Sequence, residues 1–270
     1  MRFLKTHDFG EVFGWELGWS PMGKPLMTTI FYRAGSVIID TGPSHMRPEV
    51  LKIVLQNDPE AVILTHYHED HSGNAAAIRE KLNLPVFGSP LTAEKLSRPY
   101  KILPYQHLVW GATEPLKIDF LPEVIESKGF SFVPVYTPGH SKDHVSYHVP
   151  ERGWLFSGDL YLSRRIKYFR ADEKILDQIA SLKKILALEF DALFCGHYPQ
   201  PENGKMHVAT KLQYLEDFYG KVSALADQGM NESCIMKTLG LKEQTLVKVI
   251  CFGNVSMKNM VRSVTEGRDL

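Results

Sequence analysis

The chain has 270 residues, of which 44% are hydrophobic and 23% charged, and its 31 basic and 31 acidic side chains leave no formal net charge. These values are typical of a globular protein with a core of its own. They disfavour a nucleic-acid partner, and no apolar run reaches the roughly 20 residues of a membrane helix. The first residues lack the apolar stretch of a signal peptide, and three widely spaced cysteines indicate reduced thiols, so we expect a cytoplasmic protein.

The first forty residues alternate and turn like antiparallel strands, which we expect over residues 11–15, 27–33 and 36–40. A loop rich in glycine and proline, residues 18–25, joins the first two strands. The third strand runs into Asp40-Thr41-Gly42. A helix is predicted over residues 48–56, and the apolar run 61–64 predicts a short buried strand.

The densest cluster of metal-capable side chains follows that buried strand. His66, His68, Asp70 and His71 place three imidazoles and a carboxylate within six residues. Neutral imidazole and carboxylate are preferred ligands of zinc and related divalent ions. Residues 74–82 predict a helix that Ser72 or Asn74 can cap, so the cluster lies on a strand-to-helix turn, where open α/β folds place their sites.

The same arrangement recurs further along the chain. Apolar runs at 132–136, 154–156 and 192–195 lead through small residues to His140, Asp159 and His197. One histidine after a strand is most often structural. The repetition instead predicts that several strand ends converge on one metal centre.

The remaining segments complete the expected architecture. Residues 85–88 predict a strand, and the irregular stretch 91–115 predicts either a lid over the site or a loop packed on the core. Helices are expected over 172–188 and 205–227, and two or three short ones over 231–267. We expect a catalytic domain over residues 1–228 and a helical extension over 229–270.

The donor count favours two metal ions. Seven candidate ligands are too many for one tetrahedral ion, and they are His66, His68, Asp70, His71, His140, Asp159 and His197. A carboxylate can bridge two cations, and Asp159 is the best candidate because it arrives from its own strand end. Zinc is the default metal, with manganese and iron as alternatives.

These motifs resemble those of the metallo-β-lactamase superfamily. The matching segments span about residues 27–198 in the family's order, and they are Asp40-Thr41-Gly42, His66-x-His68-x-Asp70-His71, Thr137-Pro138-Gly139-His140, Ser157-Gly158-Asp159 and Gly196-His197. The resemblance implies an α/β fold of four layers, an αββα sandwich, here with a small helical C-terminal extension. It also implies how the ligands are shared: His66, His68 and His140 for one ion, Asp70, His71 and His197 for the other, and Asp159 as the bridge.

Other roles follow from the resemblance. Asp40 would orient a ligand instead of binding metal. His68 stands where the oxygen-reducing di-iron branch carries glutamate, so that branch is disfavoured. The ligand set is shared by thioesterases of the glyoxalase II type, lactonases, phosphodiesterases and lactamase-like endoribonucleases.

We therefore expect a metal-dependent hydrolase in which a bridging hydroxide attacks a small ester, thioester or lactone, with Asp70 and Asp159 orienting the attacking oxygen. The alternatives are a phosphodiesterase or ribonuclease on the same centre and, in another class, a mononuclear iron oxygenase. His144 and Tyr198 are candidates to orient a ligand or to donate a hydrogen bond to the substrate.

A basic stretch over residues 163–170 follows Asp159. Arg165 and Arg170 could bind an anionic substrate, because a guanidinium matches carboxylate and phosphate. The alternative is a solvated loop paired with Asp172 and Glu173. A small-molecule partner is expected, nucleic acid is less favoured, and a homodimer is left open.

Overall fold

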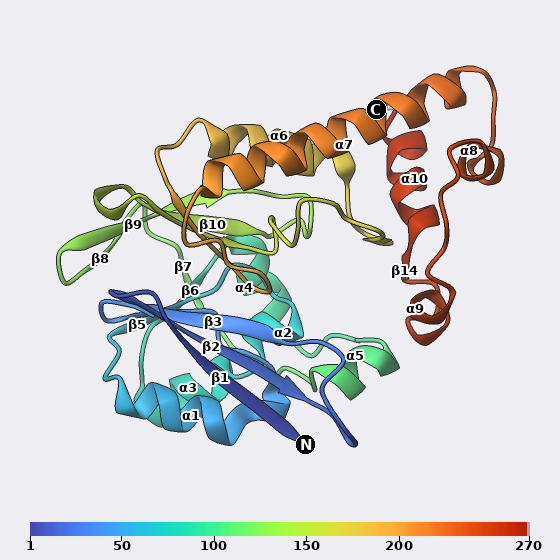
Figure 1. The fold of residues 1–270 in the computed structure, drawn as a ribbon. Helices are drawn as coiled ribbons and strands as arrows, with labels where there is room; N and C mark the ends of the chain where they lie inside the picture. Colours follow the sequence, from blue (N-terminus) through green and yellow to red (C-terminus); the bar gives the residue numbers. More distant parts are fainter. Residues whose placement is uncertain (269–270) are drawn as a thin grey trace.

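Two β-sheets packed face to face, with helices on both outer faces, organise the chain (Figure 1). The computed structural model describes residues 1–268. The first sheet has the strand order β1-β2-β3-β4-β5-β6-β7. Its strands are β1 (Arg2–Asp8), β2 (Val12–Trp19), β3 (Thr29–Ala34), β4 (Val37–Ile39), β5 (Ala61–Ile63), β6 (Val86–Gly88) and β7 (Asp119–Phe120). Neighbours are antiparallel up to β4 and parallel from β4 onwards.

The second sheet has the order β13-β11-β10-β9-β8. Its strands are β8 (Ile125–Ser127), β9 (Phe130–Tyr136), β10 (Val145–Val149), β11 (Trp154–Gly158) and β13 (Ala192–Cys195). The expected strands are thus present in both sheets. Strand β1 was not predicted, because it lies at a sheet edge and alternates little between buried and exposed residues.

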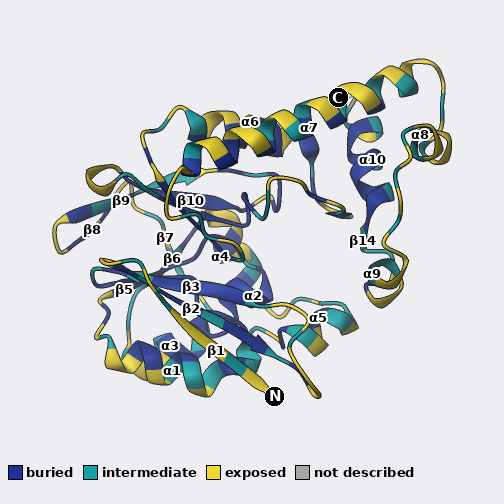
Figure 2. Cartoon of the chain, in the orientation of Figure 1, coloured by how far each residue is buried: buried dark blue, intermediate teal, exposed yellow. Residues whose placement is uncertain are grey.

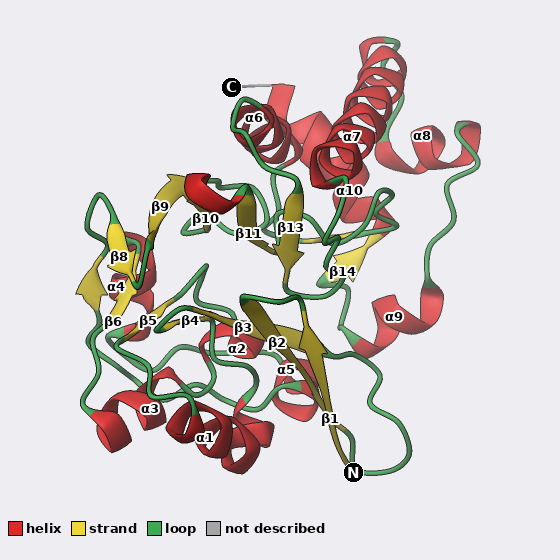
Figure 3. Ribbon diagram, turned by 60° about the vertical axis from the view of Figure 1, so that its left-hand side comes forward, coloured by secondary structure: helices red, strands yellow, loops and turns green. Residues whose placement is uncertain are grey.

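Helices cover the outer faces. Helices α1 (Arg47–Gln56), α3 (Ala75–Leu82) and α4 (Pro90–Leu96) pack against the first sheet, and α6 (Ile175–Leu186) and α7 (Gly204–Asp227) against the second. The first half of the chain also contains the short helices α2 (Glu69–Ser72) and α5 (Pro104–Val109). Three short 3₁₀ turns span Ser44–Met46, Pro150–Arg152 and Glu266–Arg268. Figure 3 shows α1 and α3 on one side of the paired sheets and α6 and α7 on the other. The expected four-layer αββα sandwich is therefore confirmed.

Apolar side chains fill each interface between the layers. The residues that join the two sheets include Tyr32, Phe132, Tyr147, Phe156 and Phe194. Separate clusters lie between the first sheet and its helices and between the second sheet and α6 and α7. In Figure 2 strands such as β3 and β10 are accordingly coloured as buried, whereas the edge strand β1 and many residues of α1 and α7 are exposed. No helix in the described part of the chain has the length and apolarity that a bilayer span requires.

Two sequence-based expectations need correction. The irregular stretch 91–115 contains the short helices α4 and α5. Asn74 occupies the position before α3 but does not cap the helix with its side chain. Its amide instead donates to the backbone carbonyls of Thr41, Gly42 and Pro43, so it ties the turn after β4 to the turn after β5.

The segment after α7 folds back onto the body of the molecule. It contains α8 (Glu232–Thr238), α9 (Thr245–Ile250), β14 (Val255–Ser256) and α10 (Met257–Thr265). Strand β14 pairs antiparallel with β12 (Phe169–Arg170), which lies inside the basic stretch. Apolar residues of α10, including Met260, Val261 and Val264, join the core cluster of α6 and α7.

Candidate metal centre

The predicted ligands meet at one edge of the sandwich, where several strands end. His66 and His68 follow β5, while Asp70 and His71 lie on the short helix α2. Asp159, His140 and His197 follow strands β11, β9 and β13 of the opposite sheet. Their donor atoms form two groups, within each of which they lie no more than 4.8 Å apart: His66, His68 and His140, and Asp70, His71, Asp159 and His197.

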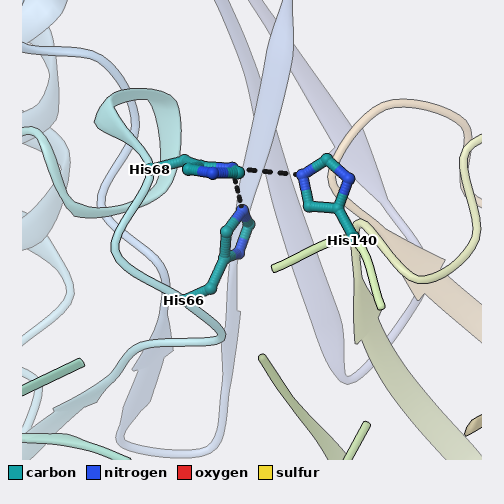
Figure 4. Close-up of side chains that lie close together, drawn as sticks. All are labelled: His66, His68 and His140. Carbon is teal, nitrogen blue, oxygen red and sulfur yellow. Dashed lines mark hydrogen bonds between the residues drawn. The ribbon is translucent and has the colours of Figure 1, made fainter. Parts of the chain in front are cut away.

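Three imidazoles make the first group (Figure 4). His68 Nδ1 lies 2.8 Å from His66 Nε2 and 3.1 Å from His140 Nε2, so three ring nitrogens point at one spot. Burial, together with the neighbouring imidazoles, lowers the pKa of His66 and of His68 well below the usual range. Neutral rings keep a lone pair available, as a metal ligand requires.

Carboxylates and imidazoles alternate in the second group. Asp159 Oδ1 lies 3.2 Å from His71 Nε2, and Asp70 Oδ2 lies 3.5 Å from His197 Nε2. Asp159 Oδ2 lies 3.4 Å from both His197 Nε2 and His140 Nε2, so this carboxylate faces both groups. Burial alone would lower the pKa of His197, but the charges of Asp159 and Asp70 raise it to about 10.

Further contacts orient the ligand rings. His71 Nδ1–H donates to Asp40 Oδ2 at 2.7 Å, which directs Nε2 towards the other donors. Asp40 itself accepts from the backbone N–H of Thr65 at 2.8 Å and has a φ of 62°, a conformation rare for a residue with a side chain. His197 Nδ1–H donates to the carbonyl of Thr28 at 2.6 Å. The contacts of Thr28 and Thr65 were not anticipated, because no local pattern marks them.

Of the two roles expected for His144, its contacts favour orienting a ligand over meeting the substrate. The ring is fully buried, and its Nε2 accepts a hydrogen bond from the backbone N–H of Asp159 at 3.1 Å. Its Nδ1 lies 2.9 Å from Thr137 Oγ1. His144 therefore cannot donate to a substrate, because neither ring nitrogen reaches solvent; it holds the turn that carries Asp159.

The candidate substrate residues lie in different surroundings. Tyr198 is 67% exposed beside His197, and Arg165 is also exposed. The Arg170 side chain is only 19% exposed, and its Nε lies 3.3 Å from Asp172 Oδ1. Burial and, to a smaller extent, the charge of Arg170 lower the pKa of His68. Cys195 is buried, and burial raises the pKa of its thiol to about 12.

Charge and hydrogen bonding both indicate that cations belong here. Among the residues whose burial the structure describes, 1–267, Lys211 is the one buried lysine or arginine, against six buried carboxylates: Asp40, Glu69, Asp70, Asp143, Asp159 and Glu173. His71 Nε2 and Asp159 Oδ1 are buried without a well-aligned hydrogen bond. Uncompensated buried charge is costly, so this donor set fits divalent ions.

An αββα sandwich with clustered histidines and aspartates at one edge defines a class of metal-binding proteins. The model of the metallo-beta-lactamase superfamily matches residues 27–197, and the chain belongs to this superfamily. The family and its members indicate a metal-dependent hydrolase.

Individual relatives share only a modest sequence identity with this chain. A beta-lactamase-like protein 2 homolog of Drosophila melanogaster is 31% identical over 202 residues, which cover 67% of this chain and 62% of the fly protein. The chain therefore spans less than two thirds of that relative. A hydroxyacylglutathione hydrolase of Serratia proteamaculans is 28% identical over 80% of this chain and 78% of its own length.

A solved metallo-beta-lactamase family protein of Thermus thermophilus shares the fold, with a TM-score of 0.63 and 18% identity. The likeness covers 93% of this chain and 91% of that one.

Proposed function

We propose that this chain is a hydrolase that uses two divalent metal ions, with zinc as the default. His66, His68 and His140 would hold the first ion, and Asp70, His71 and His197 the second. Asp159 would be shared, and this is supported by its position facing an imidazole of each group, at 3.4 Å from His140 Nε2 and from His197 Nε2. That shared position is the observation that carries the proposal.

Bound divalent ions supply Lewis acidity and lower the pKa of water from 15.7 to about 7. The protein's part is to fix the geometry. Asp40 directs Nε2 of His71, and His144 holds the backbone of Asp159. Asp70 and Asp159 bring two carboxylates together, and we propose that they orient the attacking water and accept its proton.

We propose a small ester, thioester or lactone as the substrate. The similarity to a hydroxyacylglutathione hydrolase supports a thioester, and the formal net charge of zero argues against a polyanionic partner. A phosphodiester or RNA substrate is the second candidate. It is favoured by the exposed cations Arg164, Arg165 and Lys167 just after Asp159.

The domain division is part of this proposal: residues 1–228 form the catalytic domain and 229–270 an extension. The extension supports the site, since β14 pairs with the strand that carries Arg170 and Asn254 Nδ2 donates to Tyr105 on α5 at 2.9 Å.

Metal analysis and a substrate panel test the proposal together. The reloaded protein should hold two ions per chain and hydrolyse a thioester or lactone faster than a phosphodiester. Measurements over a range of salt concentrations distinguish an RNA substrate from a small ester. Binding of RNA should weaken steeply as the salt concentration rises, whereas turnover of a small ester should change little. One ion or none per chain would contradict the two-metal proposal.

Arg170 is expected to contribute to the binding of anionic substrates. Arg170→Ala should lower kcat/KM for a carboxylate-bearing ester by about tenfold to a hundredfold, the range of a lost charge-assisted hydrogen bond, with a smaller loss for a neutral ester. Arg2→Ala is the matched control, because Arg2 is exposed on the edge strand β1 and pairs with Glu49, which is not one of the donor residues. Equal losses on both esters would refute a role in recognising the charge.

A further inference from the structure

One face of α7 is turned towards the segment that follows Asp159. His207, Lys211 and Tyr214 are spaced by four and three residues, so they share a side of the helix. Lys211 Nζ donates to the carbonyl of Leu160, and Tyr214 Oη donates to the carbonyl of Ile166 at 2.7 Å. The start of the basic stretch is therefore attached to α7.

His207 adds side-chain contacts to the same segment. Its Nδ1 lies 3.2 Å from Tyr161 Oη and 3.1 Å from Arg164 Nε. Residues next to Asp159 in the chain are thus held by three successive positions of one helical face. Of these three residues only Lys211 contacts the residue that directly follows Asp159.

The turn that carries Asp159 is held from two opposite sides. On the side of the sheet, His144 accepts from the Asp159 N–H, and on the side of the helix, Lys211 donates to the carbonyl of the next residue. Gly158 has a φ of 46°, and a Cβ there would lie 2.6 Å from His144 Nε2. The backbone around Asp159 therefore has little freedom to shift.

The burial of Lys211 has no explanation in packing alone. Its side chain is fully buried on a helix whose neighbouring core residues, Val208 and Leu215, are apolar. Burial lowers the pKa of Lys211 to about 8, although Glu173 and Asp159 oppose this change. A buried ammonium is costly, and an unbranched apolar side chain would fill the same space at less cost.

We propose that Lys211 is a positioning residue that holds the Leu160 carbonyl so that the Asp159 carboxylate faces both groups of histidines. The inference rests on the proposed function, because it gives Lys211 a part in binding the two ions. Lys211 does not touch the substrate. It acts through the backbone of the turn.

Lys211→Met and Lys211→Gln both remove the contact, since methionine has no donor and glutamine is one atom too short. Lys221→Met is the matched control, because Lys221 is exposed on the same helix. Each metal-stripped full-length variant is titrated with Zn²⁺ against a competing chelator. We expect the affinity for the second ion to fall at least tenfold in both Lys211 variants and to stay unchanged in the control.

The direction of the change in metal affinity distinguishes a positioning role of Lys211 from a purely electrostatic one. The Lys211 ammonium repels cations, so a purely electrostatic role predicts tighter metal binding once the charge is removed. Weaker binding therefore supports positioning, while unchanged or tighter binding in a folded Lys211 variant overturns it. The visible spectrum of the Co²⁺-loaded protein reports ligand geometry, and it should shift in the Lys211 variants only.

Steady-state kinetics give a second readout. At saturating metal, the Lys211 variants should lose kcat with little change in KM, because Asp159 is displaced but substrate contacts remain. The proposed function fails separately if the unmodified protein holds fewer than two ions. If it holds two and both Lys211 variants match it in affinity and kcat, only this inference fails.

Discussion

Asp159→Asn should bind fewer ions than the unmodified protein and lose about 10³-fold in kcat. The amide has the shape of the carboxylate but no charge, and it is a poor bridge between two cations. In the structure the Asp159 oxygens lie 3.2 Å from His71 Nε2 and 3.4 Å from His140 and His197 Nε2, so one substitution affects both groups. Losing one preorganised electrostatic contributor typically costs about 10²–10³ in kcat.

The measurement is metal content by elemental analysis together with kcat on the best substrate of the panel. Asp177→Asn, on the exposed face of α6, is the matched control and should keep both ions. His66→Ala should instead weaken binding at the first group and also abolish turnover. Full turnover by the Asp159 variant, or by metal-free protein, is incompatible with the proposed centre.

Removal of both ions should abolish activity and lower the melting temperature by about 20 °C. The site gathers buried carboxylates around few buried cations, so divalent ions neutralise charge that is otherwise unpaired. Ions present at about 1,000 times their Kd stabilise the fold by about 4 kcal/mol per site, and each kcal/mol shifts Tm by about 2–4 °C in a chain of this size. Melting curves with and without a chelator test this, and readdition of Zn²⁺ should restore both properties.

The stability of the chelated protein should depend on pH in a defined direction. Without ions, the pKa of His197 is raised to about 10 by Asp159 and Asp70, and that of His71 is also raised, against about 6.5 in the unfolded chain. Their contribution to stability is full below pH 6.5 and is lost as the pH rises towards 10.

Metal binding needs these imidazoles unprotonated. The melting temperature of the metal-loaded protein should therefore increase relative to that of the chelated protein as the pH rises. Melting temperatures at about pH 6, 7 and 8 measure the gap between the two forms. A gap that narrows with pH would contradict the assignment of these rings as ligands.

Local patterns in the sequence predicted much of the architecture. The apolar runs before Asp40, His66, Asp159 and His197 became strands β4, β5, β11 and β13. Short runs of this kind are informative because a buried strand must be apolar on both faces. Strand β1 lacks such a run, since one side of an edge strand faces solvent, and the β12–β14 pair is too short to leave a pattern.

Roles that depend on distant neighbours could not be predicted. For His144 the sequence left open whether it orients a ligand or meets the substrate, and only the fold shows that it is buried against the Asp159 backbone. Nothing in the local sequence marks Lys211, and only the packing of α7 over the second sheet shows that it is buried. In both cases the decisive partner is 15 or more residues away in the chain.

The sequence by itself determined the chemistry available to this protein: seven imidazole and carboxylate donors, each placed just after an apolar run or small residues. Residue type and spacing are local properties, so they can be read without coordinates. The tertiary structure alone decided how close those donors lie, which backbone contacts hold the turns that carry them, and which charges are buried, because each of these depends on distances between segments far apart in the chain.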